Sequence, residues 1–276
     1  MRIMTTVRAP LVAAPIAWGR HVYGLGLMAM GGLSLAWGDF VTGQSAPDAL
    51  PYRSLLAYAA GAIMLLTGAA MQLRRTATAS AAAIIAYFML VVMIVMDGAD
   101  LLAHWTVYGE YESAAEQFAI AAAALLVFAA NARIDEVAAA RLTRVGQVVF
   151  GLCAIVFGGA HFAYMNLTVP LVPKWLPPSQ VFWAYATGIG HIAAGIAILT
   201  GVRARLAAIL LTTMYASFQV LVHVPMLMAD PSSHYIWGEN AINLALTGAA
   251  WIAADSIAAG RSISDPAKTD SGASGD

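Results

Sequence analysis

Two histidines lie in apolar stretches of this chain, where an ionisable side chain is costly and by default marks a function. His161 follows Gly158 by three residues, and His191 stands between Gly188 and Gly195. A proline-rich segment joins the two stretches. Small residues allow helices in lipid to approach closely, so we expect both imidazoles to face neighbouring helices and not lipid.

Two more apolar stretches carry polar side chains at helical spacing. The first stripe comprises Thr212, Tyr215, Gln219 and His223, and the second comprises Glu239, Asn243 and Thr247. Pro225 cannot donate to the carbonyl of Leu221, so the helix is expected to kink or end there. Together with His161 and His191, these stripes predict polar groups converging on the outer part of the membrane, with His234 in a loop beside them.

Neutral imidazole can bind a metal or haem iron, hydrogen-bond a quinone carbonyl, or relay a proton. The spacing selects none of these, and the sequence has no HExxH, CxxCH or nucleotide-binding loop. We therefore assign no catalytic residue or metal ligand and keep quinone and haem as candidate cofactors. The candidate cofactor-binding residues are His161, His191, Gln219, His223, Glu239 and Asn243. The same side chains also fit simple helix–helix hydrogen bonding, at about 0.6 kcal/mol each.

The composition predicts a membrane protein. The chain is 61% hydrophobic and 11% charged, whereas soluble domains carry roughly a quarter charged residues. A spanning helix needs about 20 apolar residues. Eight stretches qualify: 21–38, 54–73, 76–96, 113–130, 145–164, 181–200, 206–228 and 239–255. The expected fold is all-α and polytopic, with eight transmembrane helices in a lipid bilayer. The chain has no basic patch outside its loops, so no nucleic-acid partner is expected.

Charge placement predicts the orientation. Of the 14 lysines and arginines, only Arg53 and Lys174 fall in loops on the outer side when the N-terminus is placed in the cytoplasm. This bias predicts that both termini are cytoplasmic. Cys153 is the only cysteine, which excludes an intrachain disulfide.

The sequence repeats itself. Residues 22–37 align with 149–164 at a shift of 127 positions, and 50–68 align with 176–195. Glycine pairs seven residues apart recur in four helices, as Gly24/Gly31, Gly61/Gly68, Gly151/Gly158 and Gly188/Gly195. Seven residues make about two turns, so each pair predicts a packing face. We expect two parallel four-helix repeats.

The expected organisation has five parts. They are an interfacial lead-in (1–20), a first repeat (21–130), a cytoplasmic linker (131–144), a second repeat (145–255) and a disordered tail (256–276). The linker also fits a short amphipathic interfacial helix.

The two repeats differ in polar content. Ser34, Met64 and Met93 occupy the first-repeat positions that correspond to the three intramembrane histidines. The first repeat keeps Asp97, Asp100, His104 and Glu110 near the outer surface. We therefore expect the first repeat to be mainly structural and the second to carry the site.

The second repeat resembles the DoxX-like membrane proteins over about 145–255. The resemblance is carried by Gly158-Gly159-Ala160-His161-Phe162, Val172-Pro173-Lys174-Trp175-Leu176-Pro177, Tyr185-x-Thr187-Gly188 and Arg203-x-Arg205-Leu206-Ala207-Ala208. It implies a multi-pass protein of the bacterial cytoplasmic (inner) membrane. The family name is tied to a thiosulfate:quinone oxidoreductase subunit, and other members are linked to oxidative-stress complexes. The resemblance therefore implies quinone-linked redox chemistry.

Two hypotheses follow. In the first, His161, His191 and His223 bind a quinone or a similar lipophilic molecule, Glu239 and His234 handle protons, and a membrane or periplasmic protein is the redox partner. In the second, the chain is a non-catalytic small-molecule carrier or an assembly module. The sequence leaves open whether the protein is an enzyme.

Overall fold

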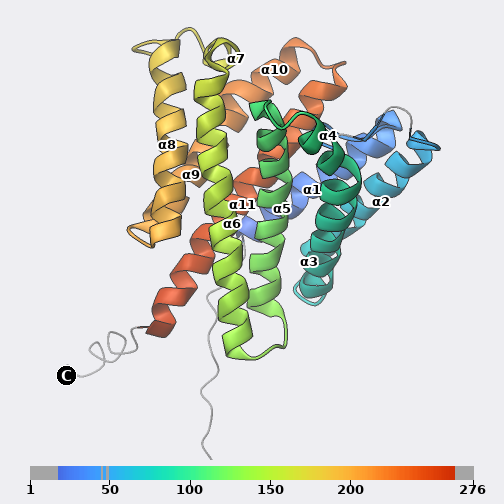
Figure 1. Cartoon of the computed structure of the whole chain (residues 1–276), viewed down its shortest axis with the longest axis vertical. Helices are drawn as coiled ribbons and strands as arrows, with labels where there is room; N and C mark the ends of the chain where they lie inside the picture. The colour runs from blue at the N-terminus through green and yellow to red at the C-terminus, as the bar shows by residue number, and fades with distance from the viewer. Residues whose placement is uncertain (1–17, 45, 48–49, 265–276) are drawn as a thin grey trace, which may run out of the picture.

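The computed structural model describes residues 18–44, 46–47 and 50–264, and all regular elements within these ranges are helices (Figure 1). They are α1 (Trp18–Trp37), α2 (Arg53–Met71), α3 (Ala77–Ala86), the π-helix η1 (Tyr87–Asp97), α4 (Gly98–Ala103), α5 (Tyr108–Asn131), α6 (Glu136–Ala163), α7 (Met165–Leu171), α8 (Gln180–Thr200), α9 (Ala204–Phe218), the π-helix η2 (Gln219–His223), α10 (Val224–Ala229) and α11 (His234–Ser264).

The described helices have the length and apolar character of a multi-pass membrane protein. Seven helical segments are long and apolar enough to cross a bilayer, where eight were expected: Arg53–Met71, Ala77–Ile94, Tyr108–Asn131, Glu136–Ala163, Gln180–Thr200, Ala204–Ala229 and His234–Ala259. The eighth expected span corresponds to α1, which carries Arg20 and His21 in its first turn and is not among the segments that meet this criterion.

The helices form a closed ring. Following the ring, α1 packs against α2, α2 against α3, α3 and η1 against α5, and α5 against α6. The order continues through α8, α9 and α11, and α11 returns to pack along α1. Across the ring, α5 also contacts α11. We refer to α1 through α5 as the first half and to α6 through α11 as the second half.

Glycines make the closest helix contacts within each half. A Cβ added to Gly31 would lie 2.5 Å from the carbonyl oxygen of Gly61, and one added to Gly68 would lie 2.6 Å from that of Gly24. In the second half, the corresponding values are 2.6 Å from Gly158 to Gly188 and 2.5 Å from Gly195 to Gly151. The prediction that these glycines form packing faces is confirmed. They let α1 meet α2, and α6 meet α8, at backbone contact.

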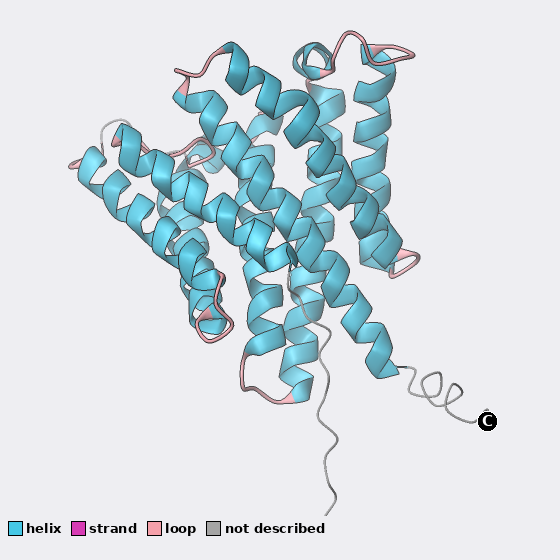
Figure 2. Ribbon diagram, turned by 180° about the vertical axis from the view of Figure 1, so that it is seen from behind, coloured by secondary structure: helices cyan, strands magenta, loops and turns pink. Residues whose placement is uncertain are grey.

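Small residues also join the two halves. A Cβ on Gly26 of α1 would lie 2.4 Å from the backbone nitrogen of Ala245 in α11, and one on Gly248 would lie 2.2 Å from that of Tyr23. In Figure 2, the view from the side opposite to that of Figure 1, long oblique helices cross in front of the upright ones. The hydroxyl of Tyr23 donates to the carbonyl of Ile120 in α5, over 2.8 Å, so a buried polar group also links α1 to the centre.

Local signals explain where the helices of the second half begin and end. Asp135 caps α6 by accepting from the backbone nitrogen of Ala138, and Ser179 caps α8 by accepting from that of Phe182. Gly201 ends α8 with φ 79°, a left-handed conformation that glycine adopts freely. The turn after it brings the chain directly back into α9.

Three predicted boundaries differ from the structure. The linker 131–144 does not form a separate interfacial helix, because residues 136–144 are the first turns of α6 and nothing in their sequence breaks a helix. The tail predicted over 256–276 is helical as far as Ser264, and 265–276 lie outside the described residues. The lead-in 1–20 overlaps α1 from Trp18, and 1–17 are likewise outside the described part.

Pro225 does not end its helix. The helical segment continues from Ala204 to Ala229, and η2 ends two residues before the proline. In η2 the backbone nitrogen of Val224 donates to the carbonyl of Gln219, five residues earlier. A π-turn of this kind rearranges the backbone bonding where proline lacks a donor, so the helix can continue through the apolar layer.

Candidate functional site

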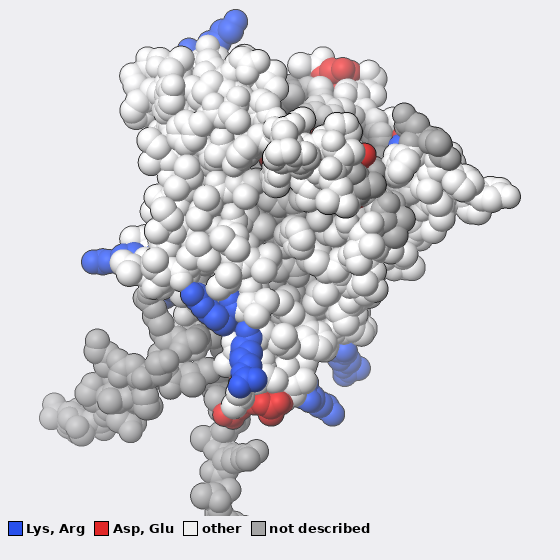
Figure 3. Space-filling view, in the orientation of Figure 1, with Lys and Arg blue, Asp and Glu red and all other residues white. Residues whose placement is uncertain are grey.

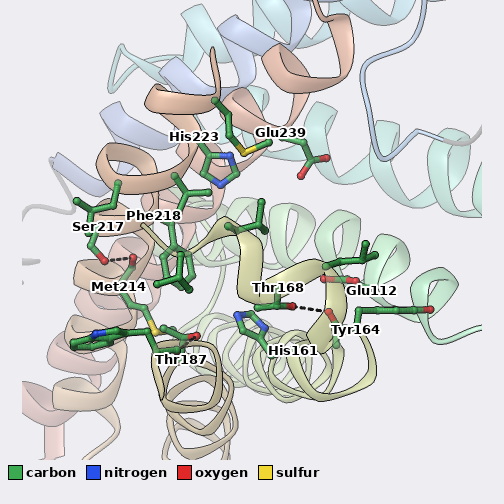
Figure 4. Close-up of a pocket in the computed structure, with 18 of the residues that line it drawn as sticks. Glu112, His161, Tyr164, Thr168, Thr187, Met214, Ser217, Phe218, His223 and Glu239 are labelled. Carbon is green, nitrogen blue, oxygen red and sulfur yellow. Dashed lines mark hydrogen bonds between the residues drawn. The ribbon is translucent and has the colours of Figure 1, made fainter. Parts of the chain in front are cut away.

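One cavity of about 820 Å³ lies between the two halves, beneath α7 and α10 (Figure 4). Its wall is largely apolar and aromatic, and its volume is typical of a small-molecule site. The polar and titratable side chains on the wall are Thr42, Glu112, Ser113, Glu116, His161, Tyr164, Thr168, Trp183, Thr187, Thr213, Ser217, His223, Tyr235 and Glu239. An apolar wall with a few converging polar groups suits an amphiphilic ligand.

His161 stands on this wall near the end of α6. Its Nδ1 lies 2.9 Å from the carbonyl oxygen of Phe157, one turn earlier in the same helix. A carbonyl only accepts, so Nδ1 carries the hydrogen and donates it, and Nε2 keeps its lone pair. No described residue bonds to Nε2, so the ring can accept a hydrogen bond from a ligand.

His191 is buried directly behind His161. Their ring centroids are 4.9 Å apart, and the His191 side chain is 1% exposed. Its Nδ1 donates to the carbonyl of Thr187 over 2.9 Å, so this ring has the same tautomer as His161. The structure thus brings the two histidines together, one on the cavity wall and one behind it. The backbone contact between Gly158 and Gly188 allows α6 and α8 to be close enough for this pairing.

His223 and Glu239 reach the same cavity from η2 and α11. Figure 4 shows both at the end of the cavity opposite His161. The imidazole of His223 forms no hydrogen bond with any described residue. Because His223 is the last residue of η2, the π-turn helps to determine the direction in which it projects.

Gln219 and Asn243 were predicted to join these residues, but neither lines the cavity. The amide of Asn243 donates to Gln219 Oε1 over 2.7 Å and to the carbonyl of Tyr215 over 3.1 Å. Gln219 in turn donates to Asn240. These amides therefore form the polar contact that holds α9 and η2 against α11.

Sequence reasoning missed two carboxyl groups from the first half. Glu112 and Glu116 lie one turn apart on α5 and line the cavity together with Glu239. All three carboxyl groups therefore share one cavity wall, and no lysine or arginine among the described residues lines the cavity. The available signal was the i, i+4 spacing of two acidic residues at the start of an apolar stretch.

The other polar residues predicted at the outer surface lie elsewhere. Asp97, Asp100, His104 and Glu110 do not line the cavity. His234 is the first residue of α11, and its ring stacks on Trp37 with centroids 5.0 Å apart. The second repeat was expected to carry the site, and the cavity extends beyond that repeat, because α5 and Thr42–Gly43 supply one wall.

The described residues do not form a ready metal site. Among them, no group of three or more histidine, cysteine, aspartate and glutamate side chains is arranged to hold a metal ion. Cys153 is buried within α6, away from the cavity wall.

Comparison with known proteins gives one match. A family model described as a domain of unknown function (DUF8561) matches residues 150–253. No curated protein and no solved structure matches the chain. The matched segment runs from α6 into α11, so it contains the histidines and Glu239 but not the α5 carboxyls.

Proposed function

We propose that this chain is a DoxX-like protein of the bacterial inner membrane that binds a quinone-type lipophilic molecule and serves as the membrane subunit of a redox assembly. The observation that carries the proposal is the cavity of about 820 Å³ with His161 and His223 on its wall. Apolar and aromatic side chains suit the ring and tail of such a ligand, and the imidazoles suit its oxygens.

The proposed architecture is eight membrane helices in two parallel repeats. The packed glycines support it, because each contact in the first half recurs 127 positions later: Gly24 on Gly68 becomes Gly151 on Gly195, and Gly31 on Gly61 becomes Gly158 on Gly188. A π-helical segment also occurs in both halves, as η1 and η2. In this arrangement the first helix of each half packs on the last helix of the other, α1 on α11 and α6 on α5.

The corresponding place in the first half is filled by protein. Met64 occupies the position of His191, and Gln44 lies on it with Nε2 3.4 Å from its sulfur. Tyr87 donates to Gln44 Oε1 over 3.0 Å, and both side chains are buried. These three buried side chains fill the space that corresponds to the histidine pair, which supports a single ligand site for the two repeats.

The proposed topology places both termini in the cytoplasm. In Figure 3 most of the visible basic side chains lie over the lower part, where Figure 1 shows the connection between α5 and α6. Cytoplasmic loops carry such an excess of lysine and arginine. The cavity then opens toward the outer side, where a periplasmic or membrane partner could accept electrons.

In the proposed site, the carboxyls of Glu239, Glu116 and Glu112 handle the ligand's protons. This replaces the expected pairing of Glu239 with His234, because His234 is stacked on Trp37 and is not on the wall. Carboxyl groups near imidazoles in a membrane cavity are typical of proton pathways.

A carrier is the second candidate function. It is favoured by the position of the cavity, which takes its walls from both halves of a parallel-repeat arrangement. A carrier would move its ligand across the membrane without oxidising it.

The test is to purify the protein in mild detergent, extract it with solvent and quantify bound quinone, with an absorption spectrum to detect haem. We expect quinone near stoichiometry in the wild type and a loss of about tenfold in His161→Ala, because the ring provides the oxygen contact. His104→Ala, which alters an exposed histidine away from the cavity, is the matched control. Wild-type protein free of quinone, which also fails to take up added quinone, would contradict the redox proposal.

A further inference from the structure

A polar group extends from the cavity wall into the interior behind it. It consists of His161, His191 and Tyr215, from α6, α8 and α9. The ring of His191 is 4.9 Å from that of His161 and 5.4 Å from that of Tyr215, between centroids. His191 and Tyr215 are 1% and 3% exposed. Three polar rings thus meet in an otherwise apolar interior.

Phe218 lies on the cavity wall beside the two buried members of this group, His191 and Tyr215. It lines the cavity, while His191 and Tyr215 do not. Its ring centroid is 6.5 Å from that of His161, 6.1 Å from that of His191 and 6.3 Å from that of Tyr215. Phe218 is also the last residue before η2, where the helix changes its hydrogen bonding. A ligand head group that enters from the cavity must displace this ring to reach His191 and Tyr215.

The inner group has hydrogen-bonding capacity that the protein does not use. The hydroxyl of Tyr215 is buried, and no described residue is its partner. The Nδ1 atoms of both histidines are committed to their own helices, which leaves both Nε2 atoms as acceptors. Leaving the buried Tyr215 hydroxyl unpaired is costly, which favours a ligand as its partner.

We propose that His161, His191 and Tyr215 form an inner subsite that selects the reduced, hydroxyl-bearing form of the quinone-type ligand. This inference rests on the proposed function and names the form of the ligand and the place of its head group. The subsite offers one donor, the Tyr215 hydroxyl, and two acceptors, the Nε2 atoms. A quinol hydroxyl both donates and accepts, so it satisfies Tyr215 and one imidazole together.

A quinone carbonyl matches the subsite only in part. It accepts from Tyr215 as a hydroxyl does, but it has no hydrogen for Nε2 and places its lone pairs against that of the ring. The imidazoles therefore discriminate between the two redox forms. Tyr215, in contrast, contributes to the binding of both.

The experiment measures dissociation constants of a short-chain benzohydroquinone and of its quinone, anaerobically and in detergent, from the fluorescence of Trp183 and the other tryptophans. We expect the wild type to bind the hydroquinone at least about tenfold more tightly than the quinone. Tyr215→Phe should weaken both by about tenfold and leave their ratio unchanged. His191→Leu should remove most of the preference for the hydroquinone.

Tyr215→Phe is expected to fold normally, because the hydroxyl that it removes has no partner in the protein. Tyr185→Phe is the control, since that ring lies on α8 away from the cavity. Equal affinity of the wild type for the two forms, or unchanged binding by Tyr215→Phe, would overturn the inference while the cavity still binds ligand. Binding of neither form by the wild type would overturn the proposed function, and the inference with it.

Discussion

Substitution of Gly195 by alanine tests the backbone contact that positions the histidine-bearing helices. A Cβ there would lie 2.5 Å from the carbonyl oxygen of Gly151 and 2.6 Å from Cγ1 of Ile155. A backbone oxygen cannot swing aside, and ordinary contact begins at 3.4 Å. The helices α6 and α8 must therefore part by roughly 1 Å, which forfeits a quarter to a half of the dispersion energy at the seam.

The expected cost follows from two opposing effects. Overpacking a close contact costs about 1–3 kcal/mol. Replacing glycine by alanine within a helix returns up to about 1 kcal/mol through helix propensity. We expect Gly195→Ala to lower the free energy of unfolding by about 1–2 kcal/mol.

The assay is unfolding in mixed micelles with increasing SDS, followed by tryptophan fluorescence. Gly190→Ala is the matched control on the same helix, because a Cβ there would meet only the sulfur of Met214, at 3.5 Å. It should be neutral or slightly stabilising. Equal unfolding midpoints for Gly195→Ala and Gly190→Ala would refute the close packing of α6 on α8.

Further predictions concern the polar groups and the topology. Asn243→Leu should lower the free energy of unfolding by about 1 kcal/mol, because it removes two hydrogen bonds between α9–η2 and α11. It should leave the hydroquinone affinity within twofold of the wild type, and a large loss of affinity would place Asn243 at the ligand. Glu116→Gln should raise the unfolding midpoint at pH 8, because it removes a half-buried carboxyl from a wall that Glu112 and Glu239 also line and that has no lysine or arginine among the described residues. Glu110→Gln, off the cavity wall, should leave the midpoint unchanged, and a lower midpoint for Glu116→Gln would contradict the prediction. In a Cys153→Ala background, Lys174→Cys should react with an impermeant thiol reagent in intact cells, whereas Arg203→Cys should react only after lysis. Reaction of Arg203→Cys in intact cells and of Lys174→Cys only after lysis would show the opposite topology.

The glycine faces show what the sequence could predict. Glycines seven residues apart lie on one helical face in any helix, and close helix packing in lipid favours small residues there. The glycine spacing therefore predicted correctly that His161 and His191 face other helices, because both residues belong to those faces.

The polar stripes that contain Gln219 and Asn243 show what the sequence could not predict. Periodicity places both on polar faces, but it does not say which neighbour a face meets. In the structure these amides meet each other across the contact between η2 and α11, and the cavity lies beside them.

The α5 carboxyls were missed for a related reason. Glu112 and Glu116 are far from the histidines in sequence, and the packing of α5 against α6 and α11 brings them to the same cavity. The alignment of the two halves favoured a site in the second half, whereas the cavity depends on the contact between the two halves. Local pattern alone cannot specify such a contact.

Photoaffinity labelling tests the central claim most directly. Purified protein would be irradiated with a photoreactive short-chain quinone, with and without excess unlabelled hydroquinone, and the modified peptides identified by mass spectrometry. The structure predicts competed labelling on both sides of the cavity, in the segment of α5 around Glu112 and in α9–η2 around Phe218. Labelling confined to lipid-facing residues such as Ile189 and Leu206, and unaffected by the competitor, would contradict a quinone site between the two halves.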